Sequence, residues 1–372
     1  MSANTQKGTY QPPKIGRAQI NLLERLCNAS GVSGNEGEVR AIVLESIKNT
    51  ASEVSVDALG NVLAIKRGEG VDLPKVMLAA HMDEVGFMLI HDEGEGIFRF
   101  DIVGGIEPHQ LAGKPVLVGE DKLPGVIGAK PIHLTKQDEL NCPISLDALR
   151  IDIGPEKANK ARVGDWAVFA TTFQRTGPSI RAKALDDRAG VATLIELLRQ
   201  APPNVDLMAA FTVQEEVGLR GAKVAAYAFD PDMSFVLDCT PAMDLPVLVD
   251  ENVYSPKERA GNARYNTRLD AGPAIYVADR ATLSDPRLIR HLVETADALD
   301  IQFQFRQPGG GGTDAGAIHI QRAGIPSVSI SVPGRYLHSA ASMIRINDWQ
   351  NHLALVHAAL DRMTMHVLAV DR

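Results

Sequence analysis

Residues 76–89, VMLAAHMDEVGFML, decide the fold class of this chain. An unbroken apolar run leads into His81, Met82, Asp83 and Glu84, which is typical of a buried strand that ends in polar groups. In open α/β sheets, functional side chains collect at the carboxyl ends of strands. The residues that follow the other apolar runs therefore indicate what His81 and Asp83 do.

The chain outside this stretch shows two patterns of predicted secondary structure. Residues 84–173 hold short strand-like segments separated by Gly, Pro and Asp, which predicts a small inserted all-β domain, PDZ-like or barrel-like. After residue 180, strands alternate with helices. This pattern predicts an α/β catalytic domain, residues 16–83 and 174–372, with a mostly parallel central sheet and helices on both faces. Residues 1–15 are expected to form a flexible arm.

Composition excludes several classes of function. The 372 residues carry 38 basic and 46 acidic side chains, a net charge of −8, and no basic run that would suggest nucleic-acid binding. Cys27, Cys142 and Cys239 are odd in number and far apart, so a disulfide framework is not expected. No apolar run reaches the roughly 18 residues of a membrane span, and the N-terminus lacks a signal-peptide pattern. We therefore expect a cytoplasmic protein that binds neither nucleic acid nor membrane.

Local signals near the N-terminus predict two helices and a hairpin. Residues 18–30 have helical spacing, and residues 33–49 open with Ser33 and Glu36, the pattern of a capping box. Residues 53–68 are expected to form a hairpin around residues 59–61.

Polar groups follow the other apolar runs as well. They are Asp186 and Asp187 in KALDDRAG, Glu215 and Glu216 in FTVQEEVG, Asp238 in FVLDCT, and His338 in SVPGRYLHS. Each alone has a structural explanation, as a helix cap, a turn residue, a solvated acid or a hydrogen-bonded histidine. Several carboxylates brought together need compensating cations. Two histidines with several carboxylates form the donor set of divalent, zinc-like ions.

Such a set supports hydrolysis. One aspartate shared by two ions, with a histidine and a carboxylate completing each, leaves room for a bridging water. Glu215 beside Glu216 can divide two tasks, one residue binding metal and its neighbour acting as the base. Asp83 is placed to hydrogen-bond the imidazole of His81 and fix its tautomer.

Six motifs together resemble a known family. In order they are AHMDEVGF, KALDDRAG, TVQEEVGLRGA, LDCTPAMDLP, GGTDAGAIH and RYLHS. Over roughly residues 16–365 the chain resembles the tetrahedral-type (TET) aminopeptidases, cytosolic co-catalytic metallopeptidases that include bacterial glutamyl aminopeptidases. The resemblance implies that His81 and Asp238 complete one metal site and Glu216 and His338 the other, with Asp186 bridging.

Further expectations follow from the resemblance. Glu215 would be the general base and acid, and Asp83 the partner that orients His81. The Asp186–Asp187 peptide bond would be cis. The stretch GGGGTDAG, 309–316, would line the site, with a plain approach to a helix as the equal alternative. The inserted β domain would mediate dimerisation, and such dimers can build hollow dodecamers.

The sequence thus predicts a dinuclear metalloaminopeptidase. It would carry two divalent ions per subunit, zinc with cobalt or manganese as alternatives, and act as a homo-oligomer on peptides with a free N-terminus. Two alternatives stay open at this point: an N-acyl amino acid deacylase or related amidohydrolase on the same metal site, and a catalytically dead assembly scaffold. The preferred N-terminal residue, the choice between dimer and dodecamer, and the role of the long segment 252–272 are also open.

Overall fold

The computed structural model describes residues 10–136, 142–245, 267–306 and 310–369. Segment 252–272 therefore lies outside the described residues up to residue 266. Of the predicted arm, residues 10–15 are described and lie against helix α9 (Ile346–Asp361). Tyr10 donates a hydrogen bond to the backbone oxygen of Ala354, and the Ile15 amide donates to the Gln350 side chain.

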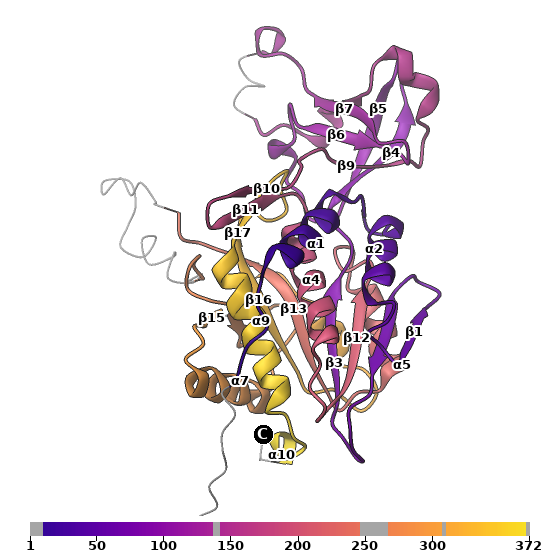
Figure 1. The fold of residues 1–372 in the computed structure, drawn as a ribbon. Coiled ribbons are helices and arrows are strands. Elements are labelled where there is room, and N and C mark those ends of the chain that lie inside the picture. The colour runs from indigo at the N-terminus through magenta and orange to yellow at the C-terminus, as the bar shows by residue number, and fades with distance from the viewer. Residues whose placement is uncertain (1–9, 137–141, 246–266, 307–309, 370–372) are drawn as a thin grey trace, which may run out of the picture.

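An eleven-stranded sheet forms the larger part of the molecule (Figure 1). Its main path runs β1-β2-β12-β3-β13-β16-β17-β11-β10, with β14 and β15 attached beside β16. The bounds are β1 Glu53–Val56, β2 Val62–Lys66, β3 Lys75–His81, β10 Gln174–Thr176, β11 Ser179–Ala182, β12 Asp206–Thr212, β13 Met233–Pro241, β14 Ala274–Tyr276, β15 Gln304–Arg306, β16 Ser327–Arg335 and β17 Ser342–Arg345.

The centre of the sheet is parallel and its flanks are not. Strands β12, β3, β13 and β16 pair in parallel, whereas β1, β2, β10, β11 and β17 pair antiparallel. The prediction of a mostly parallel sheet is thus right for the centre and wrong for the flanks. The flanks are hairpins, β1–β2 around the predicted turn and β10–β11 across Gly177 and Pro178, and such short links join only antiparallel neighbours.

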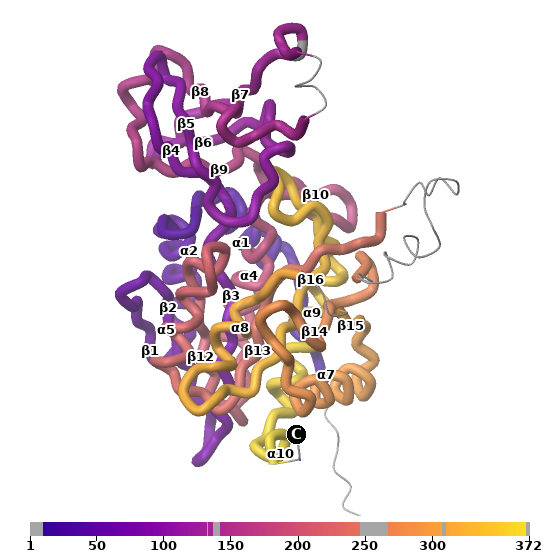
Figure 2. Tube along the Cα trace, turned by 180° about the vertical axis from the view of Figure 1, so that it is seen from behind, coloured from indigo at the N-terminus to yellow at the C-terminus, as the bar shows by residue number. Residues whose placement is uncertain are grey.

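Helices cover both faces of this sheet. Alternate residues of β3 point to opposite sides, so that Leu78 joins a core with α1, α2, α4, α7 and α9, while Met77 joins one with α5 and α8. Figure 1 looks onto α4 and α9, and Figure 2 looks onto α5 and α8. The bounds are α1 Arg17–Asn28, α2 Gly37–Ile47, α4 Leu185–Arg199, α5 Arg220–Phe229, α7 Pro286–Leu299, α8 Ala315–Ile318 and α10 His366–Ala369.

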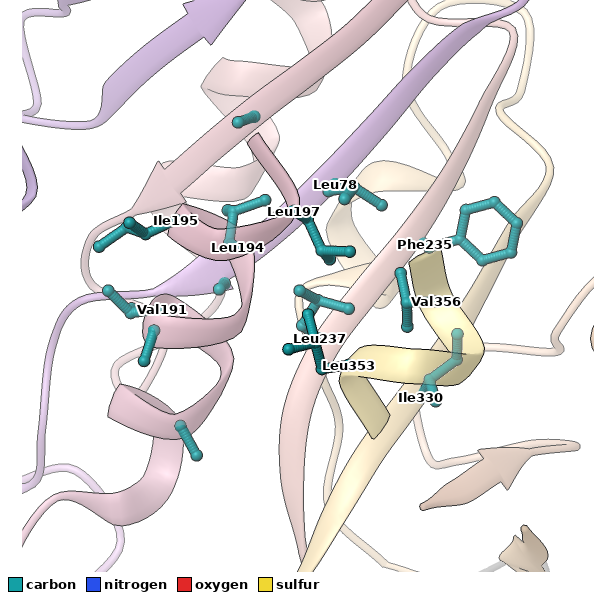
Figure 3. Packing of buried hydrophobic residues seen from close by; sticks show 14 of the residues in the cluster. Leu78, Val191, Leu194, Ile195, Leu197, Phe235, Leu237, Ile330, Leu353 and Val356 are labelled. Atoms are coloured by element: carbon teal, nitrogen blue, oxygen red, sulfur yellow. The ribbon is translucent and has the colours of Figure 1, made fainter. Parts of the chain in front are cut away.

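The largest core lies between the sheet and helices α4 and α9. Figure 3 shows Leu194 and Leu197 of α4 and Leu353 of α9 directed toward Leu237 on β13. These side chains are fully or almost fully buried. Each contributes roughly 1.5–3 kcal/mol through burial, and this packing fixes the sheet edge at which the polar groups gather.

The inserted segment folds as a closed six-stranded barrel above the sheet (Figures 1 and 2). Its order is β4 (Gly86–Asp92), β5 (Ile97–Val103), β8 (Arg150–Asp152), β7 (Leu123–Gly128), β6 (Pro115–Val118), β9 (Trp166–Phe169). The 3-10 helices η1 Pro108–Gln110, η2 Ile132–Leu134, η3 Leu146–Ala148 and η4 Pro155–Lys160 link them. Phe87 packs edge-on against Phe100 and Phe169 in a separate core. The predicted small all-β unit is confirmed as a barrel; its boundaries at residues 84 and 173 stay a prediction.

A buried ionic cluster fixes the junction between sheet and barrel. Glu84, between β3 and β4, accepts hydrogen bonds from Lys183 at 2.7 and 2.8 Å and from Arg188 at 3.2 Å. All three side chains are at most 3% exposed. Because Lys183 and Arg188 flank the start of α4, the cluster ties that helix to the entrance of the barrel.

Among the residues that the structure describes, none of the helices has both the length and the apolar character needed to cross a bilayer. The cytoplasmic location stays a prediction.

Candidate metal centre

Four adjacent parallel strands, β12, β3, β13 and β16, deliver all the proposed ligands except Asp186 to one edge of the sheet. His81 is the last residue of β3, Glu215 and Glu216 follow β12, and His338 follows β16. Asp238 was expected at the end of its strand but lies inside β13, which continues beyond it. Because parallel strands end at the same edge, residues that are far apart in sequence converge there.

Asp186 stands between the two histidines. Its Oδ1 atom lies 3.3 Å from Nε2 of His81, and its Oδ2 atom lies 3.5 Å from Nε2 of His338. The Oδ1 atom of Asp238 is 3.9 Å from Nε2 of His81, and Oε1 of Glu216 is 3.7 Å from Nε2 of His338. One aspartate thus joins two separate histidine–carboxylate pairs. The Asp186–Asp187 peptide bond is cis, as the resemblance implied.

Asp187 joins the cluster, although the sequence did not single it out as a ligand. Potential ligand atoms of His81, Asp187 and Asp238 lie within 4.8 Å of one another, as do those of Asp186, Glu216 and His338. The Oδ1 atom of Asp187 accepts the amide hydrogen of Gly190 at 2.9 Å. Its buried Oδ2 atom has no hydrogen-bond partner in the described part of the chain. An unpaired buried carboxylate oxygen beside this cluster fits a bound cation.

The electrostatics of the cluster also fit cations. Burial, reinforced by the charge of Asp186, raises the pKa of Glu216 to about 7. Burial and the charges of Asp186 and Asp187 raise the pKa of Asp238 well above its usual range. Burial acts against ionisation of Asp186 too, but hydrogen bonds from His338 and His81 hold its pKa below the ordinary value. These carboxylates ionise together only with compensating positive charge, and their oxygen and imidazole donors suit zinc-like divalent ions.

Asp83 organises the cluster from behind, and its side chain is fully buried. Its Oδ1 atom accepts the Glu215 amide hydrogen at 3.0 Å and faces Nδ1 of His81 at 3.5 Å. Its Oδ2 atom accepts the Glu216 amide hydrogen at 3.1 Å and the Ser33 hydroxyl hydrogen at 2.6 Å. Nδ1 of His81 also faces the backbone oxygen of Asp83 at 3.2 Å. Asp83 therefore contacts both the imidazole and the backbone of the two glutamates.

The predicted capping box is wrong, and its residues serve the site instead. Helix α2 begins at Gly37 with Glu36 as its N-cap, and no side chain caps it. Ser33 donates its hydroxyl hydrogen to Asp83, while Oε1 of Glu36 accepts the amide hydrogens of Gly34 and Gln214. Sequence reasoning missed the role of Ser33 because the spacing of Ser33 and Glu36 satisfies the local pattern equally well.

A cavity of about 1080 Å³ opens over the cluster. Its other walls include Tyr276, Arg280, Arg306 and residues 310–312. The glycine stretch fulfils both expectations: residues 310–312 line the cavity, and the chain enters α8 immediately afterwards. His319 is the C-cap of that helix, and its Nδ1 atom faces the Ala315 backbone oxygen at 2.8 Å. It belongs to none of the candidate ligand groups among the described residues.

The two histidine–carboxylate pairs that share one aspartate thus form a candidate metal centre, at the edge of an α/β sheet that carries an inserted barrel. A family model described as M42 glutamyl aminopeptidase matches residues 60–355, and the chain belongs to this family. Membership confirms the predicted aminopeptidase, a hydrolase, and the family implies divalent metal ions.

Relatives and solved structures agree with this assignment. The chain is 32% identical over 354 residues to the lysyl aminopeptidase of Pyrococcus furiosus, covering 92% of this chain and 96% of that protein. It resembles the TET aminopeptidase from the marine sediment archaeon Thaumarchaeota archaeon SCGC AB-539-E09 at 33% identity, with a TM-score of 0.86 and 95% and 99% coverage of the two chains. The Pyrococcus horikoshii TET1 peptidase, described as assembling into a tetrahedron or a large octahedral shell, matches at 32% identity and a TM-score of 0.79, with 93% and 100% coverage.

Proposed function

We propose that this chain removes N-terminal residues from peptides with a free N-terminus, with two divalent ions bound per subunit. The observation that carries the proposal is that the two carboxylate oxygens of Asp186 face different histidines, at 3.3 and 3.5 Å. His81 and Asp238 would hold one ion, Glu216 and His338 the other, and Asp186 would bridge them. Bound zinc, cobalt or manganese would supply Lewis acidity at the scissile carbonyl and lower the pKa of water.

Glu215 is proposed as the general base and acid. It lines the cavity but belongs to none of the candidate ligand groups among the described residues. Burial and then the charge of Asp314 raise its pKa well above the usual range. It would take a proton from the attacking water and return it to the leaving amine. Asp83 would act through His81, whose imidazole it orients.

The architecture supports two further proposals, on the type of catalytic domain and on the contacts between subunits. The α/β part would be a three-layer catalytic domain of the zinc-peptidase type, and residues 84–173 would mediate homo-oligomer contacts. The barrel exposes apolar side chains, among them Ile90, Val126 and Val163, which suits a surface covered by another copy. If dimers build a larger assembly, such as a tetrahedral dodecamer, the molar mass measured by light scattering should be many times that of one subunit.

The substitution Glu215→Gln tests the mechanism. It removes the proton-accepting oxygen while leaving the ligands in place, so we expect two metals per subunit by elemental analysis. Turnover of aminoacyl-p-nitroanilides should fall by about 10²–10⁴-fold. Glu38→Gln, at an exposed ion pair with Lys122, is the matched control and should keep full activity. Full activity in the Glu215 variant would sink the proposed role.

The two alternatives give different outcomes in the same assay. An aminopeptidase releases p-nitroaniline from substrates with a free amine, whereas a deacylase acts only on the N-acetylated copies and releases acetate from them. Both activities should disappear on chelation and return when zinc is added. A protein that retains two metals and cleaves neither series would be a scaffold rather than an enzyme.

A further inference from the structure

The loop that joins β5 to η1 in the inserted barrel lies against the metal centre. It contains Gly104 and Gly105, and Gly105 lines the cavity over the cluster. The backbone oxygen of Gly105 lies 2.9 Å from Nδ1 of His338, a proposed ligand of the second ion. A Cβ atom at Gly104 would lie 3.3 Å from Cβ of Glu216, the other residue proposed to complete that site. The barrel therefore lies against both residues that complete the second site.

The two histidines of the metal centre are held in different ways. The side chain of His81 is 3% exposed, and its Nδ1 atom faces Asp83. The side chain of His338 is 43% exposed, and its Nδ1 atom faces the barrel at Gly105. The backbone of His338 has a φ of 55°, in the left-handed region that favours glycine. Burial therefore does little to fix this imidazole, and its orientation depends on the contact with Gly105.

The hydrogen bond to Gly105 prepares the imidazole of His338 for a metal ion. A backbone oxygen only accepts, so the Nδ1 atom carries the hydrogen in this contact. The Nε2 atom of a neutral ring is then free to bind an ion, and it faces Asp186 at 3.5 Å and Glu216 at 3.7 Å. A partner that fixes the tautomer and orientation of a histidine ligand contributes about 10–100-fold to metal affinity.

Apolar contacts beside the hydrogen bond keep the two loops together. Ile106, directly after Gly105, is 8% exposed and belongs to the core of the barrel. Ala340, two residues after His338, packs against the same core. A glycine suits position 105, because a Cβ atom there would lie only 3.0 Å from Nδ1 of His338. The close approach of barrel and histidine therefore depends on the absence of a side chain at this position.

We infer that Gly105 is a positioning residue whose backbone oxygen orients His338, so that the inserted barrel determines how tightly the second ion binds. The inference rests on the proposed dinuclear function and adds a residue from outside the α/β part to the metal centre. Gly105 takes no part in the chemical step. The first ion, proposed to bind at His81 and Asp238, should not depend on this contact.

Replacing Gly105 by alanine displaces the imidazole and leaves every proposed ligand in place. Metal-free protein is titrated with zinc in competition with a chromophoric chelator, and His338→Gln identifies the binding step of the second ion. In Gly105→Ala we expect this step to weaken about 10–100-fold and the other step to stay within about twofold. Unchanged affinities at both steps would overturn the inference, and so would an equal loss at both.

Gly125→Ala is the matched control, because it crowds the same barrel away from the metal centre. A Cβ atom there would lie 2.9 Å from Cγ2 of Ile153 and 3.0 Å from the backbone oxygen of Asp152. We expect this variant to lose stability and to bind both ions as tightly as the unmodified protein. If its second step weakens as much as that of Gly105→Ala, any loosening of the barrel has this effect, and the inference fails.

A crystal structure of the zinc-loaded, unmodified protein tests the contact directly, even if Gly105→Ala does not fold. We expect Nε2 of His338 to bind the ion while Nδ1 donates to the Gly105 oxygen. A ring that has turned away from Gly105 would refute the inference. Absence of zinc binding by the unmodified protein would instead refute the proposed function, and the inference with it.

Discussion

Replacing Asp83 by asparagine tests how the metal centre is built. The carboxylate accepts hydrogen bonds from the Ser33 hydroxyl and from the amides of Glu215 and Glu216, and it faces Nδ1 of His81 at 3.5 Å. Asparagine has the same shape but a single acceptor oxygen. Its NH2 group must therefore face at least one of the donors that the carboxylate now satisfies.

The magnitude follows from these contacts. Losing one charge-assisted hydrogen bond costs about 1.5–3 kcal/mol. Because the imidazole of His81 also loses its orienting carboxylate, we expect metal affinity to fall about 10–100-fold. The free metal concentration that half-saturates the protein, measured by competition with a chromophoric chelator, gives this number directly. The kcat/KM of the same samples at saturating metal separates binding from turnover.

Ser33→Ala is the matched control, because it removes one donor and keeps the carboxylate. Its effect on metal affinity should be smaller, about tenfold or less, because the carboxylate that faces His81 and accepts from the two glutamate amides is retained. If Asp83→Asn binds metal within about twofold of the unmodified protein, the idea that this carboxylate holds His81 is refuted.

Three further substitutions test the fold. Glu84→Gln leaves two buried cations, Lys183 and Arg188, without their carboxylate and should lower the free energy of unfolding in urea by about 3–5 kcal/mol. The control Glu38→Gln, at an exposed ion pair, should lose less than about 1 kcal/mol, and similar losses in the two variants would contradict the prediction. Burial lowers the pKa of His352 from 6.5 to about 4, so the unfolded chain gains a proton first as pH falls. The free energy of unfolding should therefore drop by about 3 kcal/mol between pH 6.5 and 4, and less in His352→Gln; equal drops refute it. Trp349→Phe removes the hydrogen bond to Thr193 and should cost about 2–3 kcal/mol in thermal unfolding, where an unchanged Tm would argue against it.

The proposed ligands could be predicted because the fold gathers strand ends. His81 and the Glu215–Glu216 pair each follow an apolar run, and parallel pairing of β3 with β12 brings these runs to one edge. Asp238 was expected to end its strand, but β13 continues past it, because FVLDCT gives no local sign of where pairing stops. Its carboxylate nevertheless lies 3.9 Å from Nε2 of His81. Asp187 was not predicted as a ligand candidate because the start of α4, rather than a strand end, determines where its carboxylate lies.

The contacts of Ser33 and Arg306 could not be predicted from the sequence, because residues far away in the chain determine them. Ser33 fits a helix cap by spacing, yet it donates to Asp83, because a buried bond to a carboxylate is stronger than an exposed cap. Nothing in the sequence around Arg306 distinguishes it from a surface residue of an edge strand. Its burial depends on Thr240, 66 residues away, and on the backbone of Gly310. Local patterns carry no information about such distant contacts.

The bridging residue is the one proposed ligand that the parallel strands do not supply. Asp186 comes from the start of α4. Lys183 and Arg188, on either side of it in sequence, donate hydrogen bonds to Glu84, the residue after Asp83, and so help to position Asp186. A shift of the chain at Glu84 should therefore affect two proposed ligands. It would move His81 through Asp83, and it would move Asp186 through Lys183. Glu84→Gln should accordingly weaken metal binding in protein that is still folded, beyond its effect on stability. Trp349→Phe, which destabilises the packing of α4 on α9 away from this junction, should not.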